Sequence, residues 1–153
     1  MPNPPGVALS LADRLADGSR DVLLLIGRLA LGAIFVESGF GKLTNIAAFA
    51  ATLASRGVPA STTWATIGAC VEFFGGLAIV LGVKTRYASV LMLLFVIVAT
   101  GISHRFWELA EAARRAQEVQ FFKNLSIIGA FVLLFVSGGG RFGFDGWTRR
   151  GGA

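Results

Sequence analysis

The sequence has few charged residues. Lys, Arg, Asp and Glu make up 15% of its 153 residues, whereas apolar residues make up 54%. Soluble domains average about 25% charged residues, because their surfaces must interact with water. A chain this poor in charge is not expected to be a soluble domain. Hydrocarbon removes the need for a polar surface, so the composition predicts a membrane protein.

The chain also lacks the residues that hold metals and redox centres. It contains one cysteine, Cys70, and one histidine, His104. A single thiol cannot form an internal disulfide, which excludes a thiol oxidase that works with cysteine pairs. The same scarcity argues against a zinc site, an iron–sulfur cluster and a haem held by two histidines of one chain. We therefore expect no metal site and no covalently bound cofactor.

One apparent nucleotide-binding motif fails in its context. Residues 138–143 read Gly-Gly-Gly-Arg-Phe-Gly and match GxGxxG by letters. A dinucleotide-binding loop of this kind follows a β-strand in a βαβ unit. Here the glycines follow a long apolar run, so we reject a nucleotide site.

Four apolar runs are long enough, or nearly long enough, to cross a bilayer as helices. A transmembrane helix needs about 20 mostly apolar residues. The runs cover residues 22–41, 64–83 and 87–103, and a fourth that starts between 121 and 125 and ends at 137. Every Trp and Tyr of the chain lies at or just beyond the end of a run, where such rings favour the headgroup zone: Trp64, Tyr87, Trp107 and Trp147. The sequence therefore predicts an all-α, integral membrane four-helix bundle.

Two connections in this bundle have helical patterns of their own. Apolar residues at 46, 49, 50 and 53 follow helical spacing before Gly57 and Pro59 end the pattern, which predicts a short interfacial helix after span 1. Residues 105–120 are rich in charge, and Glu111 and Arg115 are four apart, which predicts a helical cap between spans 3 and 4. The alternative for both segments is a solvated connection.

The predicted organisation has three parts. Residues 1–21 form a polar N-terminal segment, residues 22–147 form the four-helix transmembrane domain, and residues 148–153 form a flexible C-terminal tail. No cleavable signal peptide is recognised in residues 1–21, so the first span is expected to serve as the insertion signal.

Basic residues indicate the orientation and the partner. An even number of spans places both termini on one side, together with the short loop Lys84-Thr85-Arg86. Basic loops favour the cytoplasm, so we expect both termini there. The formal charge of +5 and the pI of about 10.4 then fit anionic lipid rather than nucleic acid as the partner.

Three charged residues interrupt the apolar runs: Arg28, Glu37 and Glu72. A charge at mid-membrane costs about 2.5–3.5 kcal/mol on insertion scales, so it should face the bundle interior and have a partner. Both glutamates lie on stripes of small residues, which are typical of close helix contacts. In span 1 the stripe contains Ala30, Ala33, Glu37 and Gly41, and in span 2 it contains Gly68, Glu72 and Gly76. For Arg28 we expect Asp21 or a lipid phosphate as the partner.

The helical rise places several polar residues at similar depth. At about 1.5 Å per residue, Glu37 and Glu72 fall in the same half of the bilayer, the half in which Lys42, His104, Lys123 and Asn124 lie at span ends. One hypothesis is a polar pocket in which Lys42 and His104 donate to a carbonyl group and Glu37 or Glu72 transfers protons. The other is a salt-bridge network that only fixes packing, such as Glu72 with Lys42.

The sequence resembles the DoxX family of small, mostly bacterial membrane proteins. Five groups of residues, in this order and spacing, carry most of the resemblance: Arg28-Leu29 with Gly32; Ser38-Gly39-Phe40-Gly41-Lys42; Gly57-Val58-Pro59; Glu72 with Gly75-Gly76; and Leu81-Gly82-Val83-Lys84-Thr85-Arg86. Residues 104–107, 122–125 and 138–145 complete it, so that it covers residues 22–147.

The resemblance implies a membrane location and suggests quinone chemistry. Members of the family are linked to thiosulfate oxidation with quinone as acceptor and to detoxification systems, but no catalytic residue is established. The leading hypothesis is a quinone-associated subunit of a redox or detoxification system in the bacterial inner membrane, with electrons from a soluble or membrane redox partner. Glu37, Glu72 and His104 are the candidate proton-transfer residues, and Lys42, His104, Lys123 and Asn124 are the candidate head-group ligands.

Two alternatives remain open from the sequence. The chain could be a non-catalytic scaffold that anchors a soluble enzyme to the membrane. It could also be a small transporter, although four spans leave little room for a transport path without homo-oligomerisation.

Overall fold

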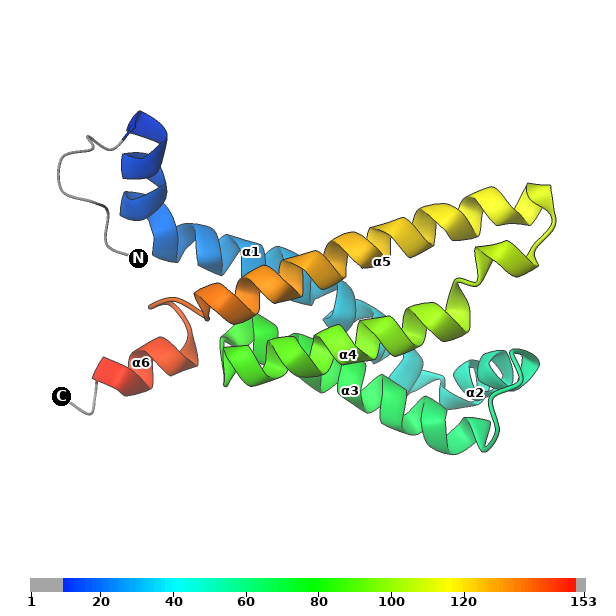
Figure 1. Cartoon of the computed structure of the whole chain (residues 1–153). Coiled ribbons are helices and arrows are strands. Elements are labelled where there is room, and N and C mark those ends of the chain that lie inside the picture. Colours follow the sequence, from blue (N-terminus) through cyan, green and yellow to red (C-terminus); the bar gives the residue numbers. More distant parts are fainter. Residues whose placement is uncertain (1–9, 151–153) are drawn as a thin grey trace.

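The computed structural model describes residues 10–150, and the side chains of residues 10–148. Over this range the chain forms helices and no strand (Figure 1). The elements are α1 (Leu11–Thr44), α2 (Ile46–Ser55), α3 (Ser61–Leu81), α4 (Thr85–Ser103), a 3-10 turn η1 (Phe106–Glu108), α5 (Glu111–Ser137) and α6 (Phe144–Arg150). In the described part of the chain, α1, α3, α4 with η1, and α5 are long and apolar enough to span a bilayer. The predicted all-α, four-helix membrane architecture is confirmed.

Helix boundaries follow local capping chemistry. The Ser10 hydroxyl accepts from Asp13 N–H while the Asp13 carboxylate accepts from Ser10 N–H, which forms a capping box at the start of α1. The Asn45 side chain accepts from Ala48 N–H, so one polar residue separates α1 from α2. Gly82 ends α3 with φ +70°, a conformation that glycine adopts without steric cost.

The closest helix contact is between α1 and α3, where glycines allow the two backbones to touch. A Cβ atom added to Gly39 would lie 2.6 Å from Phe73 N, and one added to Gly32 would lie 2.9 Å from Gly76 O. The buried face of α1 therefore carries Arg28, Gly32, Phe35 and Gly39. The predicted contact stripe through Ala30, Ala33, Glu37 and Gly41 is wrong, because all four residues are exposed. Both stripes have similar spacing, and only the packing of α3 distinguishes them.

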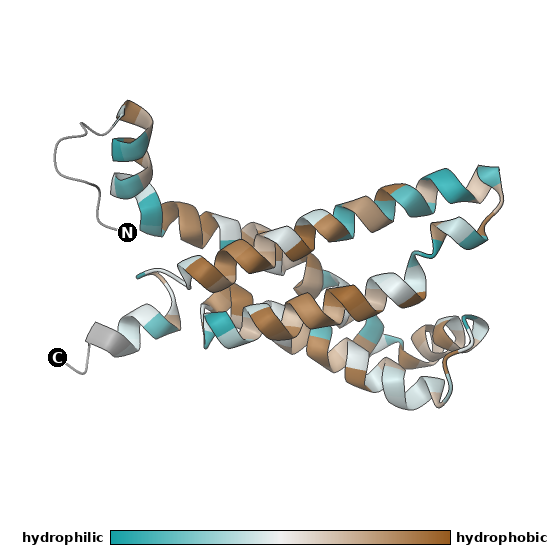
Figure 2. Ribbon diagram, viewed as in Figure 1, coloured by the Kyte–Doolittle hydropathy of each residue, from teal (hydrophilic) through white to brown (hydrophobic). Residues whose placement is uncertain are grey.

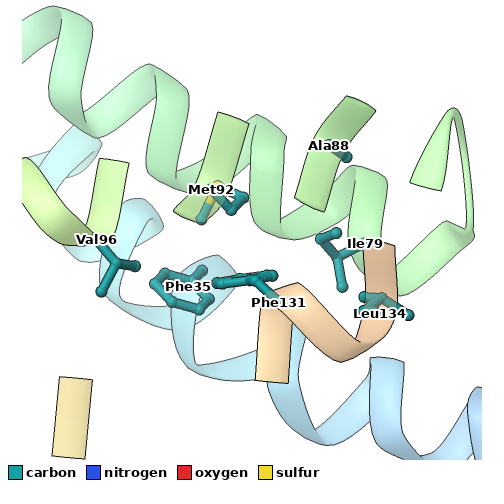
Figure 3. Packing of buried hydrophobic residues seen from close by; sticks show 7 residues of the cluster. All are labelled: Phe35, Ile79, Ala88, Met92, Val96, Phe131 and Leu134. Atoms are coloured by element: carbon teal, nitrogen blue, oxygen red, sulfur yellow. The ribbon is translucent and has the colours of Figure 1, made fainter. Parts of the chain in front are cut away.

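The interior of the bundle is one apolar cluster to which α1, α3, α4 and α5 all contribute (Figure 3). Its members are Phe35, Ile79, Ala88, Met92, Val96, Phe131 and Leu134. The rings of Phe35 and Phe131 meet at a centroid distance of 5.5 Å and join α1 to α5. Away from this cluster the helices are apolar on their outer faces as well, and Figure 2 shows hydrophobic middles with polar ends. Such a surface suits contact with lipid.

The connections differ in detail from the sequence-based expectations. The predicted short helix after span 1 is confirmed as α2, while its position at a membrane interface stays a prediction. The charged segment 105–120 is not a separate cap: it forms η1 and the first turns of α5, so the fourth helix starts at Glu111. Among the residues that the structure describes, Arg115 forms its salt bridge with Glu118, at 3.4 Å, and not with Glu111 as expected.

The ends of the chain also extend the helices. The segment predicted as residues 1–21 contains the first turns of α1, and residues 1–9 lie outside the described range. Those first turns bend away from the rest of α1 in Figure 1. This part of the sequence contains a Gly18–Ser19 pair, a common site of helix kinks, and the Ser19 hydroxyl donates to Leu15 O, a contact that often bends helices. Of the predicted tail 148–153, residues 148–150 belong to α6 and residues 151–153 lie outside the described range.

Candidate functional site

A cavity of about 930 Å³ lies between α2, α3 and α4, at the end of the bundle away from the termini. Its size is within the range of about 300–1,000 Å³ that is usual for small-molecule sites. Helix α2 forms one wall because Ala50 and Leu53 are buried against Ala65 of α3, with Phe49, Val58 and Ile102 packed around them. The short helix after span 1 therefore forms part of the cavity wall.

The cavity is continuous with the apolar outer surface of the bundle. Four aliphatic lining residues are also between 46% and 59% exposed: Ile67, Leu91, Leu94 and Val98. All four lie on α3 or α4 within the apolar part of the helices. An apolar molecule dissolved in the bilayer could thus reach the cavity from the side, without crossing water.

Lys42 places a cationic group in this cavity. Its Nζ lies 2.5 Å from Glu72 Oε2, which links the end of α1 to α3. Glu72 is only 4% exposed, whereas 31% of the Lys42 side chain is accessible. The same ammonium lies 5.1 Å from the centre of the Phe49 ring of α2, a favourable cation–π distance. The buried carboxylate and the ring together fix the ammonium at the cavity wall.

Arg56, at the C-terminal end of α2, also lines the cavity and was not predicted as a site residue. Its Nη1 is buried and has no hydrogen-bond partner in the described part of the chain. Leaving a buried donor unsatisfied costs about 1–3 kcal/mol, and more for a charged group. One feature of the sequence could have identified it: Arg56 directly follows an apolar helical segment and precedes Gly57. A basic residue in that position lies beside the apolar helix and not in the middle of a solvated loop.

His104 contributes the third basic side chain of the cavity, at the C-terminal end of α4. Its Nδ1 lies 2.7 Å from Gln117 Oε1, and a carbonyl oxygen can only accept, so Nδ1 carries the hydrogen. In the neutral ring this leaves the lone pair on Nε2, which has no partner among residues 10–148. His104 lines the cavity and can accept a proton there.

The predicted site residues separate into two groups. Lys42 and His104 line the cavity, and Glu72 is bound to Lys42. Glu37 and Lys123 are exposed on α1 and α5 and do not line it. Asn124 donates to Thr100 Oγ1 at 2.9 Å and serves the α4–α5 contact instead. The expectation that Glu37 faces a helix contact is wrong, since the α1 surface against α3 lies on the other side of the helix.

Arg28 lies far from this cavity and is fully buried. Its Nη1 donates to Ile79 O and Val80 O at 3.3 Å, and its Nη2 donates to Phe142 O at 3.1 Å. The expected partner, Asp21, pairs with Arg141 instead. Carbonyls at the C-terminal end of a helix carry partial negative charge, which favours a cation. Arg28 thereby holds the end of α3 against the α5–α6 loop.

The residues of the described range contain no group of three or more His, Cys, Asp or Glu side chains arranged to hold a metal ion. The cavity instead presents three basic side chains, those of Lys42, Arg56 and His104, in largely apolar walls, a set suited to an apolar molecule with oxygen acceptors.

Comparison with known proteins gives a consistent set of relatives. A family model described as DoxX matches residues 23–105. The chain is 35% identical to the inner membrane protein YphA of Escherichia coli, over 83% of this chain and 91% of the relative. It is 31% identical to the inner membrane protein YqjF of the same organism, over 82% and 91%. It is 28% identical to the uncharacterized membrane protein Rv3486 of Mycobacterium tuberculosis, over 85% and 82%. No solved structure gives a significant match.

Proposed function

The chain is an integral membrane protein of the DoxX family, and from this premise we propose that it binds the head group of a lipid-soluble quinone as the membrane subunit of a redox or detoxification system. The bacterial relatives YphA and YqjF are named inner membrane proteins, and we propose the same location here.

The observation that carries this proposal is an unsatisfied charged donor, Arg56 Nη1, in an apolar cavity. Arg56 Nη1 is buried and has no hydrogen-bond partner among the residues that the structure describes, and Arg56 shares the cavity with Lys42 and His104. A quinone ring offers carbonyl oxygens that accept hydrogen bonds and an apolar tail that favours the bilayer. The exposed apolar residues that line the cavity, such as Leu94 and Val98, give that tail a path to lipid.

Each polar residue has a separate role in this proposal. Arg56 and Lys42 would donate to the head-group oxygens, and the Glu72 carboxylate holds the Lys42 ammonium in place. His104 Nε2 would accept a proton from the hydroquinone or return one to the quinone, while Gln117 fixes the ring orientation through Nδ1. Interconversion of quinone and hydroquinone moves two electrons and two protons, of which His104 would exchange one proton and water at the membrane surface the other. A partner redox protein would exchange the electrons, because the sequence has neither a cysteine pair nor a second histidine.

Trp64 provides the test, because it lines the cavity and quinones quench tryptophan fluorescence. In a chain carrying Trp107→Phe and Trp147→Phe, a decyl-tailed ubiquinone should quench Trp64 saturably in mild detergent. Arg56→Gln should weaken the apparent affinity about tenfold or more, because a hydrogen bond to a charged group is worth about 1.5–3 kcal/mol. His104→Ala should weaken it less, since the imidazole ring offers at most one hydrogen bond to the head group.

Arg105→Gln is the matched control. Arg105 neighbours His104 but pairs with Glu108 at 3.3 Å and does not line the cavity. Quenching of Trp64 by the quinone in the Arg105→Gln variant should match that in the parent chain. Non-saturable quenching that is equal in all four proteins would mean that the quinone only partitions into the micelle, and the proposal would be abandoned.

A scaffold for a soluble enzyme is the second candidate, and the basic residues at the end of the bundle that carries the termini favour it. In that case a stoichiometric soluble partner should co-purify, and its capture should survive Arg56→Gln. A small transporter is the third, and uptake of the same quinone analogue into proteoliposomes would distinguish it from a binding subunit.

A further inference from the structure

The opposite end of the bundle has a second cavity, of about 660 Å³, with a very different lining. It lies between the early part of α1, the start of α4 and the loop that joins α5 to α6. Its charged lining residues are Arg20, Lys84, Arg86 and Arg141, with Asp21 and Asp145. Four cations against two carboxylates leave a formal charge of +2 (4 − 2) in this cavity.

Both carboxylates are already bound to other groups. Asp21 accepts from Arg141 N–H at 2.9 Å and lies 3.7 Å from the Arg141 guanidinium. Asp145 accepts from the backbone N–H groups of Lys84 at 2.7 Å and Thr85 at 2.8 Å, and so caps α4. In the described residues, Arg20, Lys84 and Arg86 have no carboxylate partner.

The backbone around the cavity holds two of these cations in position. Arg20 Nη2 donates to Ser137 O at 3.5 Å and Arg86 Nη2 donates to Val136 O at 3.2 Å, at the C-terminal end of α5. Gly138 and Gly140 have φ of +72° and +68°, so the loop turns sharply beside them. A Cβ atom at Gly140 would lie 3.0 Å from Asp21 Oδ1, which shows how closely the loop approaches α1. The cationic groups thus come from three separate segments and surround one space.

Aromatic residues indicate that this space lies at headgroup depth. Tyr87 lines the cavity and is 78% exposed, and Trp147 of α6 is 70% exposed. Such rings favour the membrane–water interface. A phosphate group that approaches the cavity from the bilayer at this depth would belong to a lipid.

We propose that the cavity lined by Arg20, Lys84, Arg86 and Arg141 binds the phosphate group of an anionic phospholipid. The guanidinium groups present several donors to the phosphate oxygens, and Lys84 adds a point charge that makes no side-chain bond of its own in the described residues. The excess of two positive charges selects a headgroup with net negative charge over a zwitterionic one.

The test uses the full chain, purified and delipidated in mild detergent. Its melting temperature and bound lipid (by native mass spectrometry) are measured in titrations with phosphatidylglycerol, phosphatidylcholine or inorganic phosphate. Phosphatidylglycerol should bind saturably and raise the melting temperature, and the other two should bind at least fivefold more weakly. Lys84→Gln should weaken phosphatidylglycerol binding about fivefold, as expected for one cation near an anionic surface. The double variant Lys84→Gln, Arg20→Gln should weaken it further.

Two controls make the result decisive. Lys84→Arg keeps the charge and should keep the affinity, which separates loss of charge from loss of folding. Arg105→Gln removes a cation at the other end and should bind phosphatidylglycerol as the wild type does. Equal affinity for phosphatidylglycerol and phosphatidylcholine, or no effect of Lys84→Gln, would overturn the proposal. Inorganic phosphate that bound as tightly as phosphatidylglycerol would show that a soluble anion is the ligand and would also overturn it.

Discussion

In the part of the chain that the structure describes, the contacts of a charged residue decide whether it is buried or lines the cavity. Its depth along the helix does not. Glu72 was correctly expected to be buried, and the Lys42–Glu72 pair was one of the two readings of the polar cluster. Depth alone also suggested Glu37, because the distance along a helix gives height but not the direction in which a side chain points. Arg56 was missed for a related reason: its importance depends on α2 folding back over α3.

The Lys42–Glu72 pair should contribute to stability. Removing one partner leaves a charge in a poorly hydrated place, which costs about 3–5 kcal/mol for a fully buried pair. The cost should be smaller here because part of Lys42 is exposed. We therefore expect Glu72→Gln and Lys42→Met each to lower the melting temperature in detergent, and the double variant to lower it by less than the sum of the two.

Thermal unfolding of the four proteins of this cycle checks the expectation. If Glu72→Gln left the melting temperature unchanged while quinone turnover with a partner fell, Glu72 would be a proton carrier rather than a structural partner.

At the scale of helices, the sequence predicted how many long helices form, but it did not predict which face of each helix packs against its neighbours. The apolar runs and the aromatic residues at their ends predicted four long helices, and periodicity predicted α2. Charge density led us to separate residues 105–120 from span 4, although polar residues can continue a membrane helix into water as they do in α5. Two glycine-containing stripes on α1 were equivalent in sequence, and α3 packs against only one of them.

The α1–α3 contact gives a sharp test of this packing. Gly39→Ala would place a methyl group 2.6 Å from Phe73 N, which is backbone and cannot move without shifting the helix. Overpacking of this kind costs about 1–3 kcal/mol. Gly27→Ala on the same helix meets nothing within 4 Å and should leave stability unchanged or raised. Melting temperatures of the two variants in detergent decide the matter, and equal values would contradict the contact.

The molecule as a whole has two chemically different ends. The end with the termini carries Arg28 among carbonyls and the basic cavity, whereas the other end carries the apolar cavity with Lys42, Arg56 and His104. Composition and hydropathy predicted the membrane class, because these are averages over the whole chain. The sequence suggested a polar pocket with Lys42 and His104, and both residues line the apolar cavity. The wall that α2 forms and the basic cavity at the other end could not be predicted, because each is formed by segments that meet only after folding.

The charge at the terminal end predicts the orientation. Arg20, Lys84, Arg86 and Arg141 all lie there, and basic residues beside short loops favour the cytoplasm. Fluorescent protein fused to the C-terminus should therefore fold and fluoresce in a bacterial host, while alkaline phosphatase fused at the same point should stay inactive. The reverse pattern would show that the basic end faces outward.

The central claim is that the apolar cavity binds quinone, and solvent extraction of the purified protein tests it most directly. Wild type, Arg105→Gln and the double variant Arg56→Gln, His104→Ala would be prepared identically in mild detergent, with melting temperatures to verify folding. The extracts would be analysed for quinones. We predict near-stoichiometric quinone in the first two proteins and its loss from the folded double variant. Equal traces in all three would contradict the claim and leave the cavity without the proposed ligand.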